Sequence, residues 1–351
     1  MSRSFARRYV LGPLARRGKQ DDPHDPHGDR DPYAAEPFGA LRGRRVPVTT
    51  DDGVELHVEV DEPATADEPA TAAAHRELSA LTVVFSHGYA LDRTIWHFQR
   101  RRLRGSARLV FWDHRSHGDS MRAPAESVRM QRLGQDLGAV VDAVTPDGPV
   151  VLAGHSMGGM AVLSLVEQRP ELIGDRVVGI WLLNTSARGL EYATLGLPVP
   201  LGHLTRRMVS AAVAALARSP GLVDRSRRSR TDLAYAITRR YSFSKAVSPS
   251  LVRLTARMNA NTPIETVAAF LPLFGPDLDM REGITRMRRV PAAVLGASGD
   301  LLVPVEHSRE IAALLPHADY VEVNGSGHMA LMERQDIATA QLQRLLGRVA
   351  T

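Results

Sequence analysis

One stretch near the middle of the chain constrains the fold more than any other. Residues 150–165 read VVLAGHSMGGMAVLSL, an apolar run that stops at Gly154 and resumes after two further glycines. The first run follows an Asp-Gly-Pro turn and is typical of a strand buried on both faces of a parallel sheet. The second run has helical spacing and ends before Pro170. Strand and helix are therefore joined with almost no loop.

Such a tight turn places its central residue, Ser156, in strained backbone geometry at the N-terminus of a helix. Gly154 and Gly158 stand two positions before and after it, where little room is left for side chains. Glycines and serine also occur in ordinary turns, so the strand and the helix on either side carry the interpretation. The stretch is a G-x-S-x-G nucleophile elbow, and it predicts that Ser156 is a nucleophile.

The elements on either side of the elbow alternate between strand and helix. A hairpin, VPVTT-DDG-VELHVEV, comes first. Buried strands are then expected at 81–86, 107–113, 177–184, 289–297 and 319–325, and helices at 92–103, 128–144 and 334–348. This order predicts an α/β fold with a mainly parallel, doubly wound sheet. In such sheets ligands bind beyond the carboxyl ends of the strands.

The alternation breaks at residues 188–280, which are rich in helical patterns and contain no convincing strand. We expect this segment to be a mostly helical cap inserted into a core made of residues 45–187 and 281–351. A cap over the strand ends would exclude water and shape a substrate pocket. Residues 1–44 are expected to form a basic extension followed by a disordered linker, DDPHDPHGDRDPYAAEPFGA at 21–40, and residues 62–78 a mobile loop.

The basic character of the chain is concentrated at one end. The formal net charge of the 351 residues is +5, but residues 1–20 contain six basic residues and no acidic one. The rest of the chain is therefore close to neutral. Residues 1–20 lack the apolar stretch of a secretory signal. They are expected to be a solvated arm that could contact an anionic membrane surface weakly. No motif predicts nucleic-acid binding.

The absence of cysteine rules out disulfides, thiolate chemistry and cysteine-ligated metal sites, and it fits a cytoplasmic location. The chain also has no apolar run of about 18 residues that would span a membrane.

A serine nucleophile needs a base within reach and a group that orients the base. Among thirteen histidines, His328 follows the last expected strand in a glycine-rich loop that can return over the sheet edge, whereas His155 is pinned beside the serine. The acid should lie between serine and histidine in the chain. Asp300, just after a buried strand, fits this position. The rival strand end finishes in Asn184, which carries no charge.

Several ordered motifs together resemble the α/β-hydrolase-fold serine hydrolases with a helical cap. They are HGY at 87–89, DHRSHGDS at 113–120, GHSMGG at 154–159, and the pairs GD at 299–300 and GH at 327–328. The resemblance covers about residues 45–350. It implies Ser156 as nucleophile, His328 as base, Asp300 as orienting acid, and the backbone N–H groups of Tyr89 and Met157 as the oxyanion hole.

The third motif departs from the family pattern, because Ser116 stands where relatives usually have glycine. Asp113, Arg115 and Ser120 in the same motif are interpreted as structural residues.

The expected activity is hydrolysis of a carboxylic ester or related acyl bond through an acyl-enzyme on Ser156, with no cofactor and no metal. The substrate is expected to be a small molecule with an apolar part. Serine in the elbow excludes the aspartate-dependent dehalogenases and epoxide hydrolases of this fold. Thioesterase, carbon–carbon bond hydrolase and cofactor-free perhydrolase or haloperoxidase-like activities remain open, as do a ligand receptor without turnover and the oligomeric state.

Overall fold

The structure is a computed structural model that describes residues 31–64, 78–190, 197, 199–218, 231–244 and 246–350. The basic arm at 1–20, the first part of the expected linker and most of the expected loop at 62–78 lie outside the described residues.

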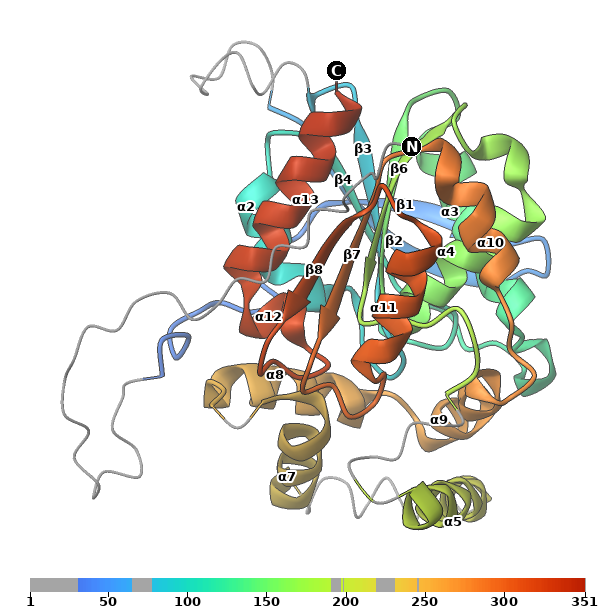
Figure 1. Cartoon of the computed structure of the whole chain (residues 1–351), viewed down its shortest axis with the longest axis vertical. Helices are drawn as coiled ribbons and strands as arrows, with labels where there is room; N and C mark the ends of the chain where they lie inside the picture. Colours follow the sequence, from blue (N-terminus) through green and yellow to red (C-terminus); the bar gives the residue numbers. More distant parts are fainter. Residues whose placement is uncertain are drawn as a thin grey trace, which may run out of the picture.

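Within the described residues, eight strands form one sheet in the order β1-β2-β4-β3-β5-β6-β7-β8 (Figure 1). The strands are β1 (Arg44–Thr49), β2 (Glu55–Asp61), β3 (Thr82–Ser86), β4 (Arg108–Trp112), β5 (Val150–His155), β6 (Val177–Leu183), β7 (Ala292–Ala297) and β8 (Asp319–Val323). The hairpin β1–β2 and the pair β2–β4 are antiparallel, and all other neighbours are parallel. The predicted mainly parallel sheet is confirmed. All six carboxyl ends of the parallel strands therefore meet at one edge.

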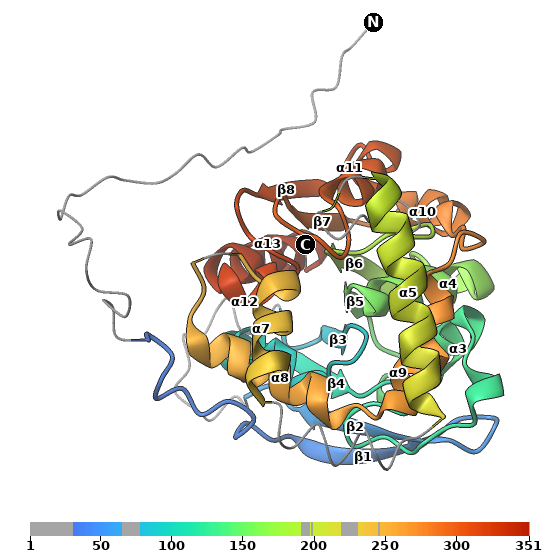
Figure 2. The ribbon, with the colours of Figure 1, turned by 90° about the horizontal axis from the view of Figure 1, so that it is seen from below.

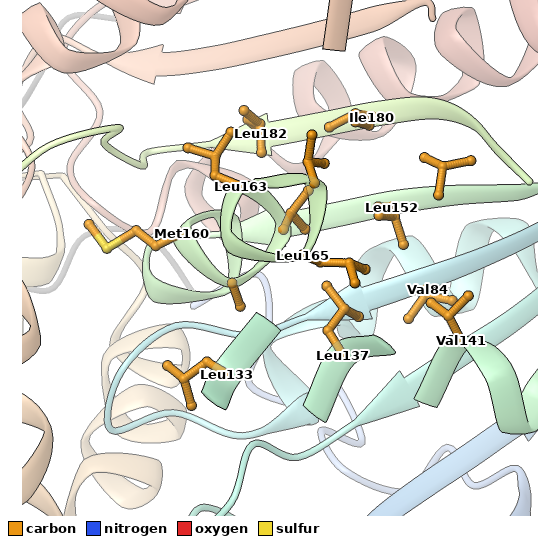
Figure 3. Close-up of a cluster of buried hydrophobic side chains, with 14 of the residues drawn as sticks. Val84, Leu133, Leu137, Val141, Leu152, Met160, Leu163, Leu165, Ile180 and Leu182 are labelled. Atoms are coloured by element: carbon orange, nitrogen blue, oxygen red, sulfur yellow. The ribbon is translucent and has the colours of Figure 1, made fainter. Parts of the chain in front are cut away.

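Helices cover both faces of the sheet, as expected for a doubly wound fold (Figure 1). One face carries α3 (Met130–Val144), α4 (Met157–Gln168), α10 (Arg281–Arg286) and α11 (Val305–Leu314). The other face carries α2 (His97–Leu103), α12 (Ala330–Glu333) and α13 (Gln335–Val349). Figure 3 shows the first interface, where Leu137 and Val141 of α3 lie near Val84 of the sheet. Burial of such side chains contributes about 1.5–3 kcal/mol each.

A helical insert lies between β6 and β7, beyond the carboxyl ends of the strands (Figures 1 and 2). Its described part contains α5 (Val199–Ala217), α7 (Thr231–Ser242), α8 (Pro249–Asn261) and α9 (Ile264–Phe270). The two ends of the insert meet. The Met280 N–H donates to the Ala187 carbonyl at 2.7 Å, and the backbones of Arg188 and Asp279 pair in an isolated antiparallel β-bridge. The insert therefore leaves and rejoins the core at one place.

Residues 31–43 differ from the expected disordered linker, because they form turns that pack against the core and the insert. Tyr33 and Phe38 surround the ring of Phe98 in α2, with ring centroids 5.1 and 5.8 Å away. Glu36 accepts a hydrogen bond from His97 at 2.7 Å. Asp31 accepts one from the N–H of Ser250 in the first turn of α8 at 2.9 Å. The packing of two aromatic side chains and these hydrogen bonds to carboxylates offset the conformational entropy cost of ordering a polar, proline-containing segment.

Candidate active site

The turn between β5 and α4 has the strained geometry that the sequence predicts. Ser156 has φ of 55°, in the left-handed region that side chains other than glycine rarely adopt. Its N–H donates to the Leu183 carbonyl of the neighbouring strand at 2.9 Å. Its own carbonyl accepts from the Thr185 hydroxyl at 2.7 Å. These bonds hold Ser156 at the N-terminus of α4, where the helix dipole favours negative charge.

The loop after β3 lies directly against this turn. A Cβ added at Gly158 would sit 2.1 Å from the Ser86 carbonyl oxygen, so only glycine allows the first turn of α4 to approach the end of β3. A Cβ at Gly88 would lie 3.2 Å from the Cβ of Ser156. The backbone N–H groups of Tyr89 and Met157 make no hydrogen bond to other described residues. Two N–H donors therefore flank the serine.

The structure brings His328 and Asp300 together. His328 Nδ1 donates to Asp300 Oδ2 at 2.7 Å, and both residues are about 6% exposed. The other carboxylate oxygen accepts from the N–H groups of Leu302 and Val303, both at 2.9 Å. Because the carboxylate is held from several sides, it fixes the orientation of the imidazole ring.

The loop that carries His328 rests on the elbow through His155. His155 Nε2 bonds to the His328 carbonyl at 3.0 Å, and the two rings lie 4.8 Å apart. Because His155 immediately precedes Ser156, this bond holds the histidine loop against the elbow. Ser156 Oγ and His328 Nε2 share no hydrogen bond in this structure, and neither atom bonds to another described residue. In enzymes without substrate such contacts are often long and tighten on binding.

Sequence reasoning missed the part that Asn184 plays. Asn184 Nδ2 donates to Asp300 Oδ2 at 2.9 Å, so the residue considered as a rival for the acid position is instead a donor to the acid. Like Ser156, it has a positive φ, of 45°. Its position at the end of a strand was the one signal in the sequence. Its contact with Asp300 requires that β6 and β7 are neighbours, which only the sheet order shows.

A second group of buried histidines lies beside the loop after β3. His87 uses both ring nitrogens, since Nδ1 donates to the Gly88 carbonyl at 2.7 Å and Nε2 accepts from the His114 N–H at 3.0 Å. Burial lowers the pKa of His87 to about 4 and that of His117 to about 3. The pKa values of His114 and His155 are lowered well below the ordinary value for the same reason. These side chains are neutral, fully enclosed parts of the core.

The motif residues interpreted as structural form buried bonds within the core. Asp113 pairs with the guanidinium of Arg93 and accepts its N–H at 2.8 Å. Arg115, fully buried, forms ion pairs with Asp136 at 2.6 Å and Asp52 at 2.9 Å. The Ser120 hydroxyl donates to the Asp113 carbonyl at 2.6 Å. These contacts confirm the structural interpretation of Asp113, Arg115 and Ser120.

Ser116 adopts φ of 63°, a conformation that suits the glycine usual at this position. Its hydroxyl accepts a hydrogen bond from the Ala123 N–H at 2.9 Å, which closes the loop and offsets the strain.

A pocket of about 510 Å³ opens between residues 116–128 and the corner of α8 and α9. Its buried end is formed by Ser116, Thr266 and Phe270, and its rim includes the charged residues Arg122 and Glu265. The pocket lies beside the loop after β4, and no residue of the elbow lines it. Phe270 packs on His117 with ring centroids 4.7 Å apart, and His117 lies 6.4 Å from the ring of Tyr89.

No group of three or more metal-ligating side chains occurs among the described residues. Within the same residues, no helix is long and apolar enough to cross a membrane.

Residues 82–335 match the family model described as the α/β hydrolase fold. A protein of Caulobacter segnis, provisionally named carbamate hydrolase RutD, is 27% identical over 253 residues, which cover 70% of this chain and 84% of that protein. The sn-1-specific diacylglycerol lipase ABHD11 of Mus musculus is 25% identical over 252 residues, covering 70% of this chain and 74% of the relative.

Solved structures are similar as well. An esterase from Thermogutta terrifontis has a TM-score of 0.66 at 24% identity, covering 88% of this chain and all of that one. The enol-lactonase from Burkholderia xenovorans has a TM-score of 0.65 at 23% identity, covering 86% of this chain and all of that one. At these identities the solved structures show a shared fold alone.

Proposed function

The chain belongs to the α/β-hydrolase fold family and is a hydrolase, and from that premise we propose that it cleaves a carboxylic ester or related acyl bond through an acyl-enzyme on Ser156. The observation that carries the proposal is the pairing of His328 with Asp300 on a loop that rests against the elbow through His155. Nucleophile, orienting acid and base then follow one another in the chain order typical of this fold.

In the proposed first step Ser156 Oγ attacks the acyl carbonyl carbon while His328 Nε2 takes the hydroxyl proton. Asp300 keeps the imidazole in the required tautomer and stabilises the imidazolium that forms. The carbonyl oxygen becomes an oxyanion between the N–H groups of Tyr89 and Met157. Each such donor contributes a factor of about 10²–10³ in rate.

His328 then returns the proton to the leaving alcohol or amine, and the bond between it and the acyl carbon breaks. In the second step a water molecule gives its proton to His328 and attacks the acyl carbon. The oxyanion collapses, the proton passes to Ser156 Oγ, and the carboxylic acid leaves. The reaction consumes one water and needs no further reactant.

The helical insert supports a role as a cap with an apolar inner surface. The hydroxyl of Tyr89 donates to the Val267 carbonyl in α9 at 2.5 Å, and its ring lies 5.3 Å from that of Phe274. Apolar side chains of the insert thus contact the residue that supplies one of the two donors. We propose an apolar acyl or alcohol part in the substrate, and a cytoplasmic site of action.

The names of the relatives are compatible with one mechanism, because esters, carbamates and glycerides all present a carbonyl to a serine. The two names do not choose between these substrates.

A fluorophosphonate probe combined with a panel of p-nitrophenyl esters of increasing chain length tests the proposal. The wild-type protein should be labelled at Ser156 and should turn over at least one ester. S156A should lose labelling and about 10⁴-fold or more of the activity. S106A is the matched control, and it should behave as the wild type. Ser106 precedes the amino end of β4, at the edge of the sheet away from Ser156.

Equal turnover by S156A would rule out the acyl-enzyme. Labelling of Ser156 without turnover of esters, thioesters or carbamates would instead favour a receptor or another chemistry on the same three residues.

A further inference from the structure

Large apolar side chains are exposed almost entirely on the insert. Six such residues are prominent in the described part of the chain, and five of them lie between residues 197 and 237. Met208 is 64% exposed, Ile237 51%, Leu216 48% and Val209 45%. The sixth, Met121, lies in the loop between β4 and α3. An apolar surface confined to one element of a protein marks an interaction site.

The large apolar side chains that are exposed on α5 share one face of the helix. At 100° per residue, Met208, Val209 and Leu216 project within an arc of about 100°, and the exposed Ala212 lies between them. An amphipathic helix normally turns such a face toward the core. Here the face points away from it, although α5 also packs against α9 on another side.

The exposed charged residues of α5 and α7 are mostly basic. On α5, the exposed Arg218 follows the end of the helix. On α7, the exposed Arg240 lies near Ile237, and Asp232 is the acidic residue of that helix. Residues 1–20 add six further basic residues to the chain. Apolar side chains among arginines suit a surface that is apolar inside and negatively charged outside.

Both helices lie at the same end of the molecule, beyond the carboxyl ends of the strands (Figure 1). In the view from below, α5 and α7 stand on either side of the strand ends (Figure 2). A flat partner could contact both helices at once.

We propose that the outer face of the insert, formed by Met208, Val209 and Leu216 of α5 and Ile237 of α7, docks on an anionic lipid surface. A second copy of the chain fits this face less well. Symmetric self-association would bring the exposed Arg218 and Arg240 of one copy toward those of the other, and like charges oppose each other. Anionic headgroups instead attract the arginines while the apolar side chains enter the interface. This proposal does not depend on the catalytic assignment.

Sedimentation of the full chain with lipid vesicles tests the proposal. The wild type should bind vesicles that contain phosphatidylglycerol about tenfold or more tightly than vesicles of phosphatidylcholine alone. The triple variant M208Q/V209Q/L216Q should lose about tenfold in affinity for the anionic vesicles. Glutamine forms helices well, so the variant preserves α5. M121Q is the matched control, because it removes an exposed apolar side chain outside the insert, and it should bind as the wild type does.

All variants keep residues 1–20, so binding by that arm alone would appear as equal sedimentation of wild type and triple variant. That result would overturn the proposal, as would equal binding of the wild type to neutral and anionic vesicles. Sedimentation velocity without lipid adds a second arm. A wild-type dimer that the triple variant abolishes, with vesicle binding unchanged, would assign the face to a second copy. Circular dichroism and urea unfolding check that each variant is folded, separately from lipid binding and from the catalytic assignment.

Discussion

Two histidine–aspartate pairs lie at the carboxyl edge of the same sheet, and they differ in what their ring nitrogens do. His328 donates Nδ1 to Asp300 at 2.7 Å and leaves Nε2 without a hydrogen bond to other described residues. His87 lies 3.9 Å from Asp113, but its two nitrogens are already bonded to the Gly88 carbonyl and the His114 N–H.

The contrast shows that burial beside a carboxylate does not by itself make a catalytic base. Asp113 serves the guanidinium of Arg93 rather than the imidazole of His87. His114 and His117 each have a ring nitrogen without a partner, yet both are enclosed in the core. A base needs an orienting carboxylate and a nitrogen that a proton donor can reach, and of these two described pairs the His328 pair fits both requirements.

Exchanging each histidine for alanine should separate the two pairs most strongly. H328A should reduce kcat/KM about 10⁴-fold with little change in the free energy of unfolding. H87A should leave a cavity and unpaired groups, lowering the free energy of unfolding by about 2–4 kcal/mol while the remaining folded protein keeps most of its activity. Ester turnover and urea unfolding measure the two effects, and the reverse pattern would interchange the assignments.

The carboxylates should divide in the same way, with a smaller effect on rate. D300N retains the shape of the side chain but no longer stabilises an imidazolium, and kcat should fall about 10²–10⁴-fold. D113N leaves Arg93 partly unpaired in the core and should cost about 2–4 kcal/mol of unfolding free energy. A D113N variant whose kcat is below one hundredth of the wild-type value, while its free energy of unfolding is unchanged, would contradict the comparison.

Acid should expose the enclosed histidines as a loss of stability. The pKa values of His87 and His117 are lowered from 6.5 to about 4 and about 3 in the folded protein. Below pH 6.5 the unfolded chain therefore binds more protons at these two histidines than the folded protein does. Stability is therefore complete above pH 6.5 and is lost as the pH falls toward 4. Each histidine contributes a slope of up to about 1.4 kcal/mol per pH unit.

Three buried or partly buried acids oppose this trend. Burial raises the pKa of Asp113 to about 6 and also raises the pKa values of Asp136 and Glu167, which favours the folded state in acid. They act against four enclosed histidines, His87, His114, His117 and His155. Urea unfolding at pH 7 and pH 5 should show a difference on the order of 3 kcal/mol. H117N keeps a hydrogen-bond donor near the position of Nδ1 and should reduce that difference. Equal stability at the two pH values would mean that these histidines are not enclosed.

The smallest expected effect concerns Asn184. N184G removes the amide that donates to Asp300 while allowing the positive φ at this position. Because Leu302 and Val303 still donate to the carboxylate, kcat should fall only about tenfold, near 1.4 kcal/mol. N184D is the informative companion, since a second carboxylate beside Asp300 should reduce activity further.

The sequence alone was sufficient for the sheet, the elbow and the His328–Asp300 pair. Each depends on a local pattern: a buried run that ends at Ser156, a glycine loop before His328, and a strand end before Asp300. Chain order then assigns the parts, because strands of a parallel sheet share one edge.

What sequence reasoning missed depends on contacts between distant segments. Asp31 bonds to Ser250, more than two hundred residues away, and nothing near residue 31 indicates that partner. A stretch rich in Asp, Pro and His resembles a linker until Tyr33 and Phe38 find the ring of Phe98. Asn184 is similar, since its role follows from which strands become neighbours in space.

The contact between Gly158 and the end of β3 has a consequence for how the molecule works. Since the first turn of α4 presses against the carbonyl of Ser86, the N–H groups of Tyr89 and Met157 belong to one rigid body. In the proposed mechanism these donors are therefore in place when the chain folds, and the oxyanion meets dipoles that need no rearrangement.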